Sequence, residues 1–144
     1  MKKEILVANR KNMYGRFYTL DSLEKIVSDW NTDIENIGHS FGIMRDNPDF
    51  VEYGERDSFL LLSEIAFEIT KMEIKGQSLF ANIKILGTKM GKTLKKNIRD
   101  IVFRTTVWGN ILDDGEVQVE RLVSLNAIFK EDDSFRNPLW EELN

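Results

Sequence analysis

IAFEITKMEIKGQSLFANIKI, residues 65–85, is the stretch of sequence that decides the fold. Its first half alternates apolar residues with more polar ones, which is the period of a strand with one buried face. Gly76-Gln77 then supplies a turn, and a second alternating run follows it. The apolar faces of the two runs hold Ile65, Phe67 and Ile69 in the first, and Leu79, Ala81, Ile83 and Ile85 in the second. The stretch therefore predicts a β-hairpin.

The segments on either side predict two helices and further strands. Asp21 and Glu24 predict a capping arrangement for the first helix, and Asp113-Asp114-Gly115 predicts a hairpin turn. The expected elements around the hairpin are a strand at 5–8, a helix at 19–30, a loop at 36–55, a helix at 87–100, strands at 101–112 and 117–129, and a peripheral acidic segment at 131–144. Regular helices do not separate the strands, so the sequence predicts an α+β fold: a small, mainly antiparallel sheet or barrel flanked by helices.

The chain has the size and composition of one globular domain. It has 144 residues, of which 42% are hydrophobic and 31% charged. That length supports one core and is too short for two ordinary domains. We expect a single domain over residues 1–137 and an acidic C-terminal tail over 138–144.

Composition also excludes several classes of function. The chain has no cysteine and a single histidine, His39, so we expect no metal site and no cofactor. GTKMGKT at 87–93 is one residue short of a phosphate-binding P-loop. A net charge of −4 argues against nucleic-acid binding. No run approaches the roughly 20 apolar residues of a membrane span, so we expect a cytoplasmic protein with no membrane partner.

His39 is the main candidate for chemistry. A lone histidine is usually a surface or capping residue, but it can also act as general base for a hydroxyl nucleophile. The hydroxyls to consider are those of Thr105 and Thr106 in VFRTTVWG, residues 102–109. Adjacent threonines in a strand are otherwise simply good β-formers. Spacing alone leaves both interpretations open.

From about residue 5 to residue 137, the chain resembles the prohead core protein proteases of tailed bacteriophages. ANRKNMYGRFYTLDSLEKIV, residues 8–27, is similar to the family's opening segment, with Thr19 in place of a common proline. ENIGHS, residues 35–40, is similar to the segment that carries the catalytic histidine. The stretch from Phe67 to Ile98 resembles the family's hairpin and the helix after it.

This resemblance implies a fold related to herpesvirus assemblin and a serine-type active site. It implies a head-maturation endopeptidase that cleaves scaffold and capsid proteins inside the prohead, within the host cytoplasm. It does not determine whether the chain forms a homo-oligomer. Cleavage in the family commonly follows glutamate. Leu139-Trp140-Glu141 would then be a candidate self-processing site.

The chain departs from the family pattern at the catalytic positions. FRTTVW, residues 103–108, stands where the family has Gly-Val-Ser-Ser-Arg-Gly, so Thr105 lies at the expected nucleophile and Thr106 is the alternative. Asn126, in LNAI, lies at the aspartate that orients the histidine. An internal threonine carries a β-methyl that crowds attack, and asparagine cannot stabilise an imidazolium as a carboxylate does. Trp108 in place of glycine would disturb a backbone oxyanion hole.

Two hypotheses follow from the resemblance. In the first, the chain is an active peptidase with Thr105 as nucleophile, His39 as general base and Asn126 as orienting residue. In the second, the chain is a pseudo-protease that keeps the fold as a structural or scaffold-associated component of the head. The retained histidine favours the first hypothesis, and the changes around it favour the second.

Overall fold

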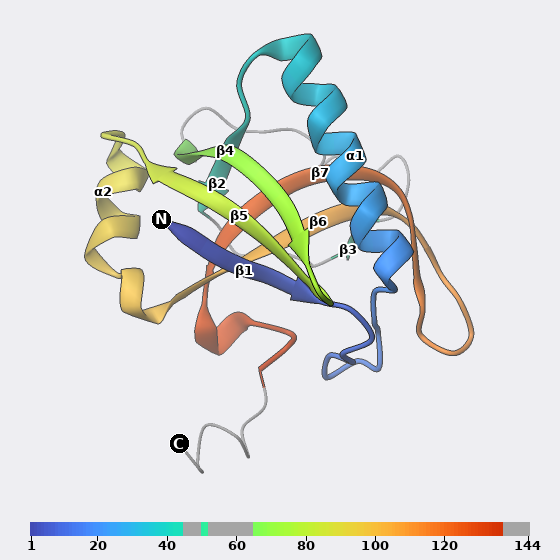
Figure 1. Cartoon of the computed structure of the whole chain (residues 1–144). Coiled ribbons are helices and arrows are strands. Elements are labelled where there is room, and N and C mark those ends of the chain that lie inside the picture. The colour runs from blue at the N-terminus through green and yellow to red at the C-terminus, as the bar shows by residue number, and fades with distance from the viewer. Residues whose placement is uncertain (45–49, 52–64, 137–144) are drawn as a thin grey trace.

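The computed structural model describes residues 1–44, 50–51 and 65–136, which form one curled sheet with two helices (Figure 1). The strands and helices are β1 (Lys2–Val7), α1 (Leu20–Ile37), β2 (Phe41–Met44), β3 (Phe50–Val51), β4 (Ile65–Lys75), β5 (Ser78–Ile85), α2 (Lys89–Lys96), β6 (Ile101–Ile111) and β7 (Val117–Phe129). Short 3₁₀ turns cover Ile98–Asp100 and Lys130–Asp132. Neither described helix is both long enough and apolar enough to span a bilayer.

The sheet has the strand order β1-β5-β4-β2-β7-β6-β3. Neighbouring strands are antiparallel except for the pairs β2–β7 and β3–β6, which are parallel. The sheet curls into a half-barrel (Figure 1). The Arg104 guanidinium on β6 donates to the Ile5 carbonyl of β1 at 2.9 Å. The predicted α+β class with a mainly antiparallel sheet is confirmed.

The β4–β5 hairpin forms as predicted, with Gly76 at a φ of +60° in the turn. Phe67 and Ile69 face the core, but the register shifts between Ile69 and Lys71. The extra residue changes which positions face inward, so Met72 is the next buried apolar residue of β4. Simple alternation therefore predicts the buried positions only in the first half of this strand.

Helix α1 is longer than predicted, and its capping residue is different. The Thr19 hydroxyl accepts from the Ser22 N–H at 3.2 Å, so Thr19 is the N-cap in place of the predicted arrangement with Asp21 and Glu24. The helix continues past Trp30 to Ile37, where Gly38 ends it in the left-handed conformation at a φ of +87°. Its last turns are mainly exposed, although Ile34 continues the apolar spacing after Trp30 and packs against the core.

Strand β2 lies inside the segment predicted to be a loop. It is inserted between β4 and β7 at the centre of the sheet. Gly42 in β2 faces the ring of Phe67, and no side chain larger than hydrogen fits there. A four-residue strand with a central glycine has too short a pattern to be recognised from sequence.

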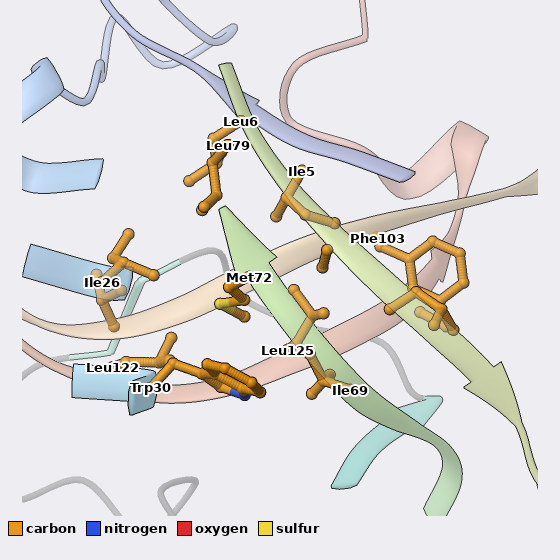
Figure 2. Close-up of a cluster of buried hydrophobic side chains, with 14 of the residues drawn as sticks. Ile5, Leu6, Ile26, Trp30, Ile69, Met72, Leu79, Phe103, Leu122 and Leu125 are labelled. Carbon is orange, nitrogen blue, oxygen red and sulfur yellow. The ribbon is translucent and has the colours of Figure 1, made fainter. Parts of the chain in front are cut away.

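The core lies between the inner face of the curled sheet and α1. Figure 2 shows Ile26 and Trp30 of α1 beside Met72, Leu122, Leu125 and other buried residues of the strands. The rings of Phe67 and Phe103 meet edge to face at 5.1 Å between centroids. Polar contacts fix the helix on β7, where Ser22 donates to the Val117 carbonyl at 2.9 Å.

The segment predicted to be a peripheral acidic tail is part of the fold up to residue 136. Asp133 is buried, and its two carboxylate oxygens accept from the Arg104 Nε at 3.0 Å and the Arg104 Nη2 at 2.9 Å. Asp133 Oδ1 also accepts from the Phe135 N–H at 3.1 Å, and Phe135 is buried. The prediction of a peripheral segment was therefore wrong for Asp133. The tail 138–144, with its candidate site Leu139-Trp140-Glu141, lies outside the described residues.

A loop held by Asn12 connects β1 to α1. Asn12 Oδ1 accepts from the backbone N–H groups of Tyr14 and Arg16, both at 3.0 Å, and Gly15 supplies a φ of +76°. The Asn12 amide donates to Ser134 Oγ at 3.2 Å. The asparagine of the opening segment therefore has a structural role: it closes the loop and attaches it to the C-terminal segment.

Candidate active site

Strands β6 and β7 carry the predicted nucleophile and orienting positions. They are antiparallel, with Arg104 opposite Asn126, Thr105 opposite Leu125 and Thr106 opposite Ser124. Paired side chains share one face of a sheet, and successive side chains point to opposite faces. Thr106 and Asn126 therefore lie on one face of this hairpin, and Thr105 lies on the other.

The Thr105 side chain faces the apolar core. Its pairing partner is Leu125, and Phe103, two residues earlier on the same strand, belongs to the core as well. Thr105 is 1% exposed, and its Oγ1 has no hydrogen-bond partner within the described residues. A buried hydroxyl without a partner costs about 1–3 kcal/mol. In the part of the chain that the structure describes, no group is placed to take the proton of Thr105.

Thr106 and Asn126 are joined directly on the other face. Asn126 Nδ2 donates to Thr106 Oγ1 at 2.8 Å, and the same amide nitrogen lies 3.4 Å from the Arg104 carbonyl oxygen. Ser124 Oγ donates to Asn126 Oδ1 at 3.0 Å. Both Thr106 and Asn126 are fully buried. These contacts use both donors of the asparagine amide, and the hydroxyl of Thr106 is an acceptor in its bond with Asn126.

His39 lies on the same side of the sheet as this pair but is not bonded to it. It sits between the end of α1 and β2, where Ile43 pairs with Asn126. The imidazole is exposed and stacks on Phe41, with 5.7 Å between ring centroids and 11° between planes. Phe41 and Ile43 are two residues apart in the strand, so both share the face of Asn126. Within the described part of the chain, His39 makes no hydrogen bond.

The structure thus joins Thr106 to Asn126, places His39 on their side of the sheet, and separates Thr105 from both. Ser124, which the sequence reasoning did not consider, completes the polar cluster. Ser124 and Asn126 are two residues apart in a strand, so their shared face could have been predicted from spacing.

The residues after Thr106 continue strand β6 and do not form an open active-site loop. The β6–β7 register shifts between Thr106 and Val107 and again between Trp108 and Gly109, which places two irregularities beside the candidate nucleophile. Val107 is fully buried, and the half-buried Trp108 ring lies under the Arg121 guanidinium at 6.0 Å. In the described ranges 1–44, 50–51 and 65–136, no three acidic or histidine side chains are grouped to hold a metal ion.

Of the comparisons with known proteins, the one with solved structures is informative. No protein-family model matches the chain, and no curated protein matches it in sequence. Among solved structures, the bacteriophage T4 capsid assembly protease gp21 is similar, with a TM-score of 0.66 and 20% sequence identity. The match covers 90% of this chain and 80% of the phage protein. At this identity, the likeness shows a common fold.

Proposed function

We propose that this chain is a protease-fold protein of phage head assembly that binds scaffold and capsid proteins within the prohead without cleaving them. The likeness to the T4 capsid assembly protease supports a role in phage head assembly. The observation that carries the absence of cleavage is the hydrogen bond from Asn126 Nδ2 to Thr106 Oγ1. In that contact, Asn126 at the orienting position bonds directly to the Thr106 hydroxyl, and His39 takes no part.

Hydrolysis by a hydroxyl nucleophile needs a different order of contacts. The histidine must accept the proton of the hydroxyl, and a third group must accept from the histidine and fix its tautomer. Here the donors of Asn126 are directed to Thr106 and to the Arg104 carbonyl, and its oxygen accepts from Ser124. His39 is therefore not oriented by Asn126. Losing such an orienting group costs about four orders of magnitude in rate in serine proteases.

One observation favours a second candidate, a peptidase with Thr106 as nucleophile and His39 as general base. Thr106, Asn126 and Ile43 lie on one face of the sheet, and Ile43 belongs to the strand that follows His39. In that reaction, Thr106 Oγ1 would attack the scissile carbonyl carbon while His39 took its proton. His39 would return the proton to the departing amine, and water would then hydrolyse the acyl-enzyme. The core-facing hydroxyl of Thr105 favours Thr106 over Thr105 as the nucleophile of such an enzyme.

Co-expression with the scaffold and major capsid proteins of the phage tests both candidates. The samples are the wild type, His39→Ala, Thr106→Val and the matched control Thr105→Val, each analysed by intact-mass spectrometry. We expect full-length partners in all four samples and co-purification of this chain with at least one of them. Thr105→Val removes only an unpartnered hydroxyl, so this control is expected to fold normally.

A different pattern of products would identify an enzyme. Partner proteins cleaved by the wild type and by Thr105→Val, but not by His39→Ala or Thr106→Val, would establish the peptidase with Thr106 as nucleophile. Cleavage lost in Thr105→Val and kept in Thr106→Val would instead restore the role of Thr105 that the family resemblance implies.

A further inference from the structure

A cavity on another part of the surface is lined by charged side chains of one sign, all of them positive among the described residues. Its lining residues come mainly from α2, β5 and the start of β1, three elements that lie close together in Figure 1. The cavity volume is about 930 Å³. In the part of the chain that the structure describes, four lysines and no acidic residue line it: the lysines are Lys2, Lys84, Lys92 and Lys95. The chain as a whole has a net charge of −4. The cavity is therefore a positive region on a protein whose overall charge is negative.

Three of these lysines have no acidic partner of their own. Lys2 forms an ion pair with Glu73 at 2.8 Å; this bond and the one from Lys71 lower the pKa of the Glu73 carboxyl to about 2. Within the described residues, by contrast, Lys84, Lys92 and Lys95 form no ion pair, and all three are exposed. Glu68 lies opposite Lys84 in the β4–β5 pairing but forms no ion pair with it. Ammonium groups with few direct counter-charges repel one another, so an anion placed among them is stabilised.

The remaining lining groups limit what kind of anion fits. Ile85 and Leu86, both half-buried, give the cavity an apolar side. The start of α2 is capped internally, because Thr88 Oγ1 accepts from the Gly91 N–H at 3.0 Å. None of the described lining residues is an arginine, so they do not provide the planar fork that binds a phosphate at two points. Exposed, separated lysines beside apolar side chains suit several carboxylates on an extended chain better than one compact phosphate.

We propose that this cavity binds an acidic segment of a partner protein. Its aspartate or glutamate side chains would pair with Lys84, Lys92 and Lys95, and an apolar side chain would contact Ile85 and Leu86. The site is separate from the Thr106–Asn126 pair and does not depend on whether the chain cleaves anything.

Helix α2 offers a matched test. Lys92 and Lys95 line the cavity, whereas Lys89 and Lys96 are exposed on the same helix and do not line it. The variants K92E/K95E and K89E/K96E therefore change the net charge equally. The probe is a fluorescein-labelled peptide of alternating glutamate and leucine, with binding measured by fluorescence anisotropy at low and at physiological salt. Circular dichroism confirms that both variants are folded.

We expect the wild type to bind the peptide more weakly as salt rises. K92E/K95E is expected to weaken binding about tenfold or more, because two attractive contacts become repulsive, while K89E/K96E stays within about twofold. Equal losses in the two variants, or no binding by the wild type, would overturn the proposal. Tighter binding of an oligodeoxythymidine than of the peptide, or displacement of the peptide by inorganic phosphate at low millimolar concentration, would also overturn it.

Discussion

Asp133→Ala is expected to lower the free energy of unfolding by about 3–5 kcal/mol, the cost of breaking a buried ion pair by removing one partner. The side chains of Arg104 and Asp133 are only 15% and 7% exposed. Without the carboxylate, the guanidinium loses two charge-assisted bonds in a place that water reaches poorly. The Phe135 N–H loses its acceptor too. Urea unfolding followed by tryptophan fluorescence measures the change.

Asp132→Ala is the matched control for this prediction. Asp132 is adjacent in sequence and exposed, so its replacement is expected to change stability by less than about 0.5 kcal/mol. In a double-mutant cycle, Arg104→Met combined with Asp133→Ala should lose clearly less than the sum of the single losses, because neither charge is then left alone. A small effect of Asp133→Ala, similar to that of Asp132→Ala, would show that the C-terminal segment is not held at Arg104.

Gly42→Ala is expected to destabilise the protein by about 3 kcal/mol, at the upper end of the cost of overpacking a core. A Cβ at Gly42 would meet three atoms of the Phe67 ring, which is fully buried. The ring cannot move away freely, because it packs edge to face against Phe103. The strand β2 would have to shift between its two neighbours. Thermal unfolding by circular dichroism measures the loss.

Gly87→Ala provides the comparison, because a Cβ there meets no atom within 4 Å and its φ is not in the left-handed region. We expect its stability to equal that of the wild type or to exceed it slightly. Adding Phe67→Leu to Gly42→Ala should recover part of the loss by removing ring atoms from the contact. If Gly42→Ala and Gly87→Ala were equally stable, β2 would not lie against Phe67.

Local sequence signals predict much of this fold. The alternation in 65–85, the turn at Asp113-Asp114-Gly115 and the helical spacing before Trp30 all correspond to elements of the structure. The sequence fails where a long-range contact decides the outcome. β2 is a strand because β4 and β7 flank it, and Asp133 is buried because Arg104, 29 residues away, needs a carboxylate.

The candidate site is predicted only in part, for a similar reason. The resemblance leads to β6, β7 and the segment of His39, and β2, which follows His39, is the neighbour of β7 in the sheet. It does not determine which of two adjacent threonines faces Asn126, because a shift of one residue exchanges the two faces of a strand. The pairing of Thr106 with Ser124 settles that choice in the structure, and neither the composition nor the motif contains it.

The most direct test of the central claim, that no catalytic relay links the hydroxyl to the histidine, is the ¹⁵N chemical shift of the His39 ring at fixed pH. His39 is the only histidine, so a long-range ¹H–¹⁵N spectrum shows one pair of ring nitrogens. We predict that Thr106→Val leaves both shifts where the wild type and the Thr105→Val control have them. A clear displacement of one ring nitrogen in Thr106→Val alone would show that the Thr106 hydroxyl donates to His39. That result would contradict the account.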